Sequence, residues 1–181
     1  MLAYLLIGLA ILTRFAIALH WLPQAFHFTP LGAALLYFGA RRSRAQMWVP
    51  VALLFATDVV LTRFVYHWPL TFEVFSSVFY YILAIFIGGL LKEKTTAPGI
   101  AGASMLGSIT FFVISNLFVW ADGGMYPLNF TGLIACFTAA IPFFRGTLAG
   151  DLVFSFAIFG TPMLLEVWQR RRAAAAVAVR N

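Results

Sequence analysis

The chain has 181 residues, of which 62% are hydrophobic and 10% are Asp, Glu, Lys or Arg, whereas soluble proteins average about 45–50% apolar and about 25% charged residues. This composition excludes a soluble domain of any size, and the lack of period-two alternation excludes a membrane β-barrel. The formal charge of +6 does not indicate nucleic-acid binding, because the basic residues stand between apolar runs and in the tail, where they set membrane orientation. We therefore predict an all-α integral membrane protein.

The first three apolar runs are candidate membrane spans, each of which needs about 20 residues to cross roughly 30 Å of hydrocarbon. Residues 2–19 have neither a basic start nor a small-residue cleavage site, so we expect a span of the mature protein rather than a signal peptide. Residues 30–40 follow the loop 20–29 and are short for a span, but their small residues would let a neighbouring helix approach closely. Residues 47–66 form the third predicted span.

Two further spans are predicted in the middle of the chain, at residues 72–91 and 99–120. In the second of them Gly99, Ala103 and Gly107 recur every four residues, and small residues at this spacing make a flat face for helix packing. A loop signal, Asp122-Gly123-Gly124, follows.

The remaining segment, residues 129–172, is too long for one straight span, and Pro142 and Gly146 interrupt it. If only residues 148–168 cross, most basic residues face one side of the membrane, as the positive-inside rule requires. These residues are Arg41, Arg42, Arg44, Lys92, Lys94, Arg170, Arg171, Arg172 and Arg180. We therefore predict six transmembrane helices in one domain, residues 1–172, with a short outer or re-entrant helix at 129–143 before the last span. Both termini, including the tail 173–181, are expected on the cytoplasmic side of the inner membrane.

Ionisable residues inside membrane spans cost roughly 2.5–3.5 kcal/mol each near the helix centre and are therefore functional candidates. At a rise of about 1.5 Å per residue from the inner end, Arg14 lies at a depth of about 18 Å and Asp58 at about 16 Å. Their equal depth predicts an intramembrane ion pair. Such a pair either only locks two helices together or takes part in ligand binding, and both interpretations stay open.

Polar residues near the outer ends of several spans converge on one level and are candidates for substrate binding. They are His27, Arg63, Glu73, Asn116, Trp120, Tyr126, Arg145 and Asp151. Asn116 and Arg145 are the strongest candidates, since Arg145 departs from the charge asymmetry and is flanked by helix-breaking residues. Other roles are open: Glu73 suits a helix N-terminus, Arg63 can extend to the membrane surface, and Arg145 can pair with Asp151 or a lipid phosphate.

Neither a metal site nor a catalytic motif is indicated. The histidines, His20, His27 and His67, lack HxH or HxxxH spacing. No paired carboxylates, HExxH motif or nucleotide-binding glycine-rich loop is present. We therefore expect no bound metal, no cofactor and no enzymatic activity.

Three short motifs mark the entry to the second span, the middle of the third and the opening of the last. They read Phe28-Thr29-Pro30-Leu31-Gly32-Ala33-Ala34, Thr57-Asp58-Val59-Val60 and Ile141-Pro142-Phe143-Phe144-Arg145-Gly146-Thr147-Leu148. In this order they resemble the substrate-binding S components of energy-coupling-factor vitamin transporters, which are small six-helix membrane proteins. The chain also resembles an uncharacterised family described as transport proteins, especially at residues 116–120, 126–127 and 140–151.

The resemblance implies capture of a vitamin or precursor at the outer side, and an energy-coupling module of a transmembrane coupling protein plus ATPases as partner. Residues 2–19, however, lack the small residues spaced by four through which S components dock on that module. The histidine near the N-terminus that nickel and cobalt members use is also missing.

We therefore expect a membrane-embedded solute-binding or uptake protein for a small organic molecule, surrounded by lipid and without nucleic acid. One alternative is an integral membrane enzyme that acts on a lipid or isoprenoid through Asp58, Asp151 or Arg145. The other is a structural membrane protein without a ligand.

Overall fold

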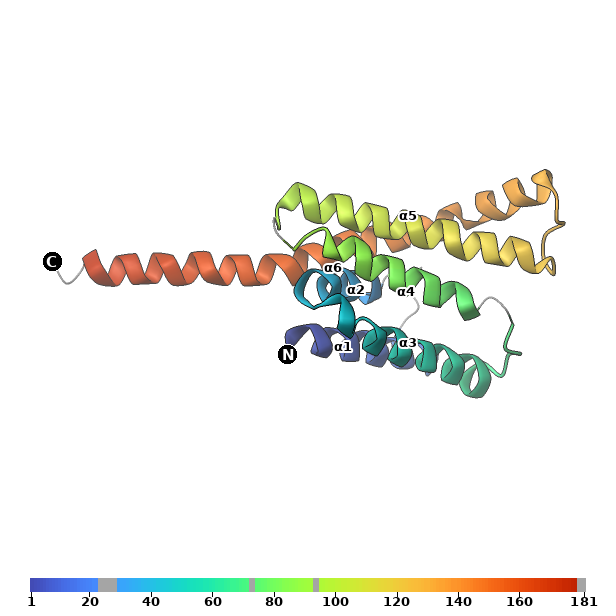
Figure 1. Ribbon diagram of the computed structural model, residues 1–181, viewed down its shortest axis with the longest axis horizontal. Helices are drawn as coiled ribbons and strands as arrows, with labels where there is room; N and C mark the ends of the chain where they lie inside the picture. The colour runs from blue at the N-terminus through green and yellow to red at the C-terminus, as the bar shows by residue number, and fades with distance from the viewer. Residues whose placement is uncertain (23–28, 72–73, 93–94, 179–181) are drawn as a thin grey trace.

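The structure of the chain, a computed structural model, describes residues 1–22, 29–71, 74–92 and 95–178, and within them it consists of helices and connecting turns, with no strand (Figure 1). The α-helices are α1 (Leu2–Ala18), α2 (Leu31–Arg41), α3 (Trp48–Val60), α4 (Val74–Gly89), α5 (Ala97–Asp122) and α6 (Phe130–Ala178). A 3-10 turn, η1 (Arg44–Gln46), leads into α3, and a π-helical turn, η2 (Leu61–Val65), continues it. The predicted all-α class is confirmed.

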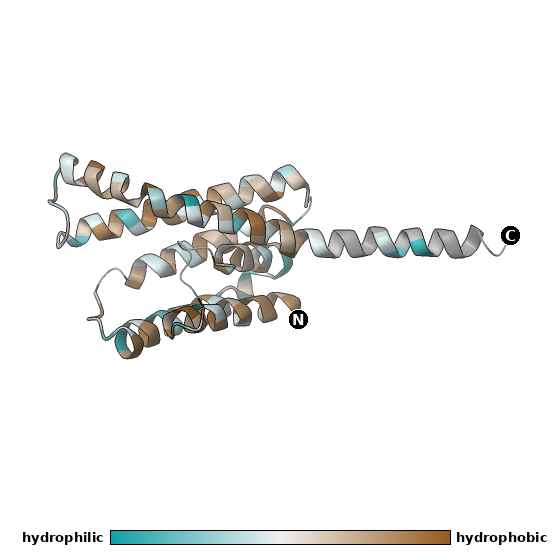
Figure 2. Cartoon of the chain, turned by 180° about the vertical axis from the view of Figure 1, so that it is seen from behind, coloured by the Kyte–Doolittle hydropathy of each residue, from teal (hydrophilic) through white to brown (hydrophobic). Residues whose placement is uncertain are grey.

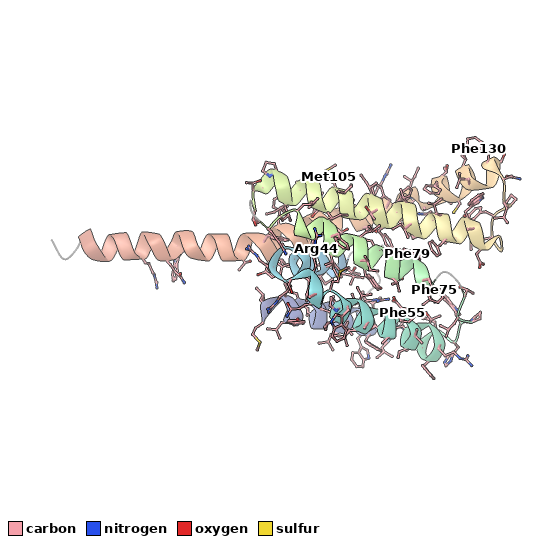
Figure 3. All side chains as sticks on the ribbon, viewed as in Figure 1. Arg44, Phe55, Phe75, Phe79, Met105 and Phe130 are labelled. Carbon is pink, nitrogen blue, oxygen red and sulfur yellow. The ribbon has the colours of Figure 1, made fainter. Side chains whose placement is uncertain are left out.

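The helices run alternately from one end of the bundle to the other (Figure 1). One end carries the starts of α1, α3 and α5 and the end of α2, and Arg44 lies there (Figure 3). The other end carries the end of α5, where Gly123 adopts a left-handed conformation with φ 70° in the predicted loop. The basic residues Arg41, Arg42 and Arg44 therefore stand at the same end as the N-terminus.

The prediction of six complete spans is wrong by the criterion of helix length. Among the described residues, three helical segments are long and apolar enough to cross a membrane: Arg44–Val65, Ala97–Asp122 and Phe130–Thr161. The helices α1 and α4 are apolar but have 17 and 16 residues, and α2 has 11. At about 1.5 Å per residue α2 extends only about 16 Å, because it starts after Pro30 and stops at the basic cluster.

The expected separate helix at residues 129–143 is also wrong, because α6 is continuous from Phe130 to Ala178. Pro142 lies inside it, and an interior proline removes one main-chain hydrogen bond without having to end a membrane helix. The alanine-rich segment 173–178 belongs to the helix as well, in line with the high helix propensity of alanine. The last turns of α6 project beyond the bundle (Figure 1).

The centre of the bundle is α2, in which every residue from Gly32 to Ala40 is buried. It contacts α1, α4, α5 and α6. Two glycines permit the closest approach: an added Cβ at Gly39 would collide with the main-chain oxygen of Ile85 on α4, and one at Gly88 with that of Leu36 on α2. The small residues of the predicted second span thus bring backbone against backbone, as expected.

Many large apolar side chains are exposed on the outside of the bundle, and hydrophobic residues recur along its helices (Figure 2). Leu5 on α1 is 65% exposed, Phe64 after α3 is 68% exposed, and Phe79 on α4 is 55% exposed (Figure 3). Single exposed apolar residues are ordinary in soluble proteins, but a surface with this many marks contact with lipid or protein. Together with the long apolar helices, it indicates a helical protein associated with a membrane.

Replacing Gly88 by alanine tests the approach of α4 to α2. The added Cβ would meet the main-chain oxygen of Leu36, so the helices must separate, and we expect the free energy of unfolding to fall by about 1–3 kcal/mol. Gly102→Ala on α5 is the control, because nothing lies within 4 Å of an added Cβ there, and alanine favours the helix. Thermal unfolding in detergent measures both variants, and equal melting temperatures would contradict this packing.

Candidate functional site

A polar cavity of about 240 Å³ lies inside the bundle. Its lining comes from α1, the residue Thr29, α2, α4, α5 and α6, and it is polar or charged except at Leu31, Gly32 and Phe111. The polar lining residues are Arg14, Thr29, Ser77, Tyr80, Tyr81, Thr147 and Asp151. Five helices therefore line one space in an otherwise apolar bundle, and three of them, α1, α4 and α6, supply its polar side chains together with Thr29.

One side of the cavity holds a network of Arg14, Asp58 and Tyr81. The Arg14 guanidinium forms an ion pair with Oδ1 of Asp58 and donates a hydrogen bond to the Tyr81 hydroxyl at 3.1 Å. The Tyr81 hydroxyl donates to Oδ2 of Asp58 at 2.8 Å. The Arg14 side chain keeps 22% exposure against 7% for Asp58, and Arg14 and Tyr81 line the cavity whereas Asp58 does not.

The cavity is also lined by Asp151, which is buried on α6. Ser108 of α5 donates a hydrogen bond to Oδ2 of this carboxylate at 2.7 Å, and the Ser104 hydroxyl donates to the main-chain oxygen of Asp151 at 3.3 Å. The carboxylate also lies against the first turn of α2, because an added Cβ at Gly32 would collide with Oδ1 of Asp151. A helix N-terminus carries a partial positive charge, so the start of α2 stabilises the carboxylate.

Three aromatic rings, those of Tyr80, Tyr81 and Phe111, also line the cavity. The ring centroid of Tyr80 lies 5.0 Å from that of Phe111 and 5.9 Å from that of Tyr81. The rings of these two pairs are inclined to one another by 64° and 57°. Phe111 and Thr147 also line a second, more apolar cavity of about 210 Å³ between α5 and α6.

The ion pair expected from equal depth is present, and Asp151 lines the polar cavity. Arg63 and Arg145 are exposed and belong to the lining of neither cavity. For Arg145 the reason is its angular position: two residues before Thr147, at about 100° per residue, it lies on nearly the opposite face of α6.

Three other predicted ligand-binding residues, Asn116, Trp120 and Tyr126, do not line the polar cavity. Asn116 lines the second cavity, and its amide donates to the Phe112 carbonyl oxygen of its own helix at 2.7 Å. The Trp120 indole donates to the Pro127 carbonyl oxygen at 3.1 Å and holds the turn that contains the half-buried Tyr126. His27 and Glu73 lie outside the described residues.

The described histidines occupy helix ends rather than a common site. His20 follows α1 with φ 61° and His67 follows η2 with φ 56°. Such left-handed conformations are uncommon outside glycine, with histidine, asparagine and aspartate enriched among the exceptions. Among the described residues no group of three His, Cys, Asp or Glu side chains could hold a metal ion.

Several lining residues were not among the predicted binding residues, chiefly Ser77, Tyr80, Tyr81 and the supporting Ser108. Tyr80 and Tyr81 stand in the middle of an apolar run, where a buried hydroxyl requires a hydrogen-bonding partner. Ser104 and Ser108 follow Ala103 and Gly107 along the predicted packing stripe of α5. A hydroxyl group in the middle of a predicted span, next to the small residues of a packing face, was therefore the sequence feature that could have identified these residues.

The ion pair predicts non-additive effects on stability. Asp58→Leu leaves the Arg14 charge buried without its partner, and we expect a loss of about 3–5 kcal/mol, as for other broken buried pairs. The Arg14→Leu, Asp58→Leu double variant leaves no unpaired charge and should be more stable than Asp58→Leu alone. Tyr81→Phe removes two hydrogen bonds and should cost about 1–3 kcal/mol.

Unfolding measurements on the two single variants and the double variant complete this cycle. If the effects of Arg14→Leu and Asp58→Leu simply add in the double variant, the two side chains do not stabilise each other.

Comparison with known proteins places the chain in a family but assigns no activity. No characterised protein and no solved structure matches it significantly, so the resemblance to S components stays a prediction. The model of a family of unknown function, DUF6580, matches residues 1–175. Because this match covers nearly the whole described chain, the protein belongs to the DUF6580 family.

Proposed function

We propose that the protein captures a small organic solute in the polar cavity between α1, α2, α4, α5 and α6. The observation that carries the proposal is the cavity itself, in which an arginine and an aspartate from different helices line one space inside an apolar bundle. Ionisable groups in such surroundings are costly, and they usually mark a substrate or ion pathway.

The construction of the site favours binding over helix locking alone. The Arg14 and Asp58 pair and its Tyr81 partner satisfy one another, so they hold the wall of the cavity in a defined shape. Pockets for drug-sized ligands measure about 300–1,000 Å³, and a cavity of about 240 Å³ suits a smaller metabolite. The polar groups and aromatic rings together match the usual composition of ligand sites.

The resemblance to S components adds to this proposal the side of the membrane from which the solute enters and the chemical class of the solute. In that scheme the solute, a vitamin or a precursor, enters from the outer side of the inner membrane, and both termini are cytoplasmic. An energy-coupling module of a transmembrane protein plus ATPases is the corresponding partner, although α1 lacks the small-residue docking pattern. Lipid surrounds the bundle, in keeping with its apolar exterior.

An enzyme acting on a lipid is less well supported. Its candidate groups were Asp58, Asp151 and Arg145, and they do not meet in one site. Asp58 is held in the ion pair, Asp151 lines the cavity, and Arg145 is exposed. General acid–base chemistry needs its groups within hydrogen-bond reach of one substrate, so this arrangement favours binding.

Mass spectrometry of the purified full chain tests capture. We expect a small molecule to be released when the wild-type protein is denatured. Ser77→Phe places a ring in the cavity and should abolish its recovery, whereas Ser76→Phe changes the neighbouring residue, which does not line the cavity, and should retain it. The absence of any released molecule from wild type, or equal recovery from both variants, would overturn the proposal.

Cysteine labelling in intact cells tests the orientation. In a Cys136→Ser background, cysteines at Ser43 and Thr95, at the basic end of the bundle, should react with an impermeant thiol reagent only after lysis, because basic segments stay cytoplasmic. A cysteine at Met125, exposed at the opposite end, should react in intact cells. Labelling of Ser43→Cys before lysis would refute cytoplasmic placement of this end.

A further inference from the structure

We infer that the solute is a small organic cation, with the Asp151 carboxylate as its countercharge and the rings of Tyr80, Tyr81 and Phe111 as its aromatic wall. This inference rests on the proposed function, since it names the chemistry of the solute that the same cavity takes. It depends on the balance of charge around the cavity, on the surroundings of Asp151 and on the arrangement of the rings.

The charges around the cavity do not balance. Arg14 supplies one positive charge and Asp58 one negative charge, and Asp151 supplies a second negative charge when its carboxyl group is ionised. The negative charge of Asp58 neutralises the charge of Arg14, because the guanidinium is paired with Asp58 and also donates a hydrogen bond to Tyr81. One buried carboxylate, that of Asp151, is left over, and an anionic solute would add a second uncompensated negative charge beside it.

The polar groups around Asp151 compensate its charge only in part. Ser108 satisfies Oδ2, and among the described side chains Oδ1 accepts no hydrogen bond and Asp151 forms no ion pair. The first turn of α2 at Gly32 contributes roughly half an elementary charge. A cationic solute in the cavity would supply the rest, through a charge-assisted hydrogen bond or a direct ion pair.

The aromatic wall suits a cation better than an anion. An aromatic ring is negative over its faces, so an ammonium group is attracted to them within about 6 Å of the centroid. Three rings from α4 and α5 line this one cavity, and Tyr80 contacts both of the others. A carboxylate beside aromatic rings suits an organic ammonium group, which can pair with the carboxylate and is attracted to the rings.

Charge-matched probes test this inference. The full chain in detergent is equilibrated with choline, ethanolamine, butylammonium and putrescine, together with neutral 3,3-dimethylbutan-1-ol, which has the shape of choline, and anionic 3,3-dimethylbutanoate. Bound molecules are measured by mass spectrometry after gel filtration. We expect wild type to retain at least one cation and to prefer choline to its neutral analogue whenever choline is bound.

Asp151→Asn removes the charge and keeps an acceptor for Ser108, and we expect it to bind the retained cation about 10-fold to 100-fold more weakly. Asp122→Asn, which changes an exposed carboxylate beyond the cavity, should bind as wild type does. If Asp151→Asn does not fold, the wild-type preference for cations over the neutral and anionic probes decides the question alone.

The outcomes separate the two proposals. Retention of the neutral or anionic probe in preference to the cations, or unchanged cation binding by Asp151→Asn, refutes the cationic solute while capture of a solute stands. If no probe binds but wild type releases an endogenous molecule on denaturation, the charge of that molecule decides, and a neutral or anionic one overturns the inference. The absence of any bound molecule overturns both proposals.

Discussion

Close backbone contact between α2 and its neighbours is the constraint on which the rest of the bundle depends. A helix buried on every side must present small residues where other backbones approach, and Gly39 of α2 and Gly88 of α4 meet this requirement by removing side chains from the contact. Lipid supplies no hydrophobic driving force between helices, so such packing must hold them together. The helices α1, α4, α5 and α6 can surround α2 because it is narrow.

The short length of α2 also creates the site. The helix begins only at Leu31, so its N-terminal turn lies inside the bundle. The cavity lies at this N-terminal end of α2, where Thr29, Leu31 and Gly32 line it. Longer neighbours extend past it and supply the polar walls. The missing side chain of Gly32 lets the Asp151 carboxylate rest on the start of α2, so the same glycine-rich helix explains both the packing and the burial of a charge.

The sequence allowed prediction of those features that depend on distance along one helix. The span predicted at residues 2–19 corresponds to α1, and the one at 99–120 lies within α5. Depth depends only on the rise per residue, and for this reason Arg14 and Asp58 were expected together. Helix ends were harder to predict from the sequence. Pro142 suggested that the helix is interrupted, although a proline can remain inside a membrane helix.

The lining of the cavity could not be predicted in the same way, because it depends on the direction in which each helix faces. Thr147, Asp151, Ser155 and Phe159 are buried at intervals of four residues along α6, and Arg145 lies off this face. Depth places Arg145 near Thr147, but only the packing of α6 on α2 and α5 decides which of them points inward. Tyr80 and Tyr81 present the same difficulty, since an aromatic residue in an apolar run is compatible with lipid contact, core packing or a binding wall.

The two charged groups of the cavity belong to different parts of the bundle. Arg14 connects α1 to α3 through Asp58, while Asp151 connects α6 to α5 through Ser108. The helices α2 and α4 lie between these pairs and contribute Gly32, Tyr80 and Tyr81 to the cavity. A solute that contacts Asp151 and the rings of α4 would therefore touch two parts of the bundle. One is α6, which Asp151 connects to α5, and the other is α4, whose Tyr81 accepts a hydrogen bond from Arg14. Because Tyr81 bonds Arg14 and Asp58 at once, its side chain joins the wall of the cavity to the contact between α1 and α3.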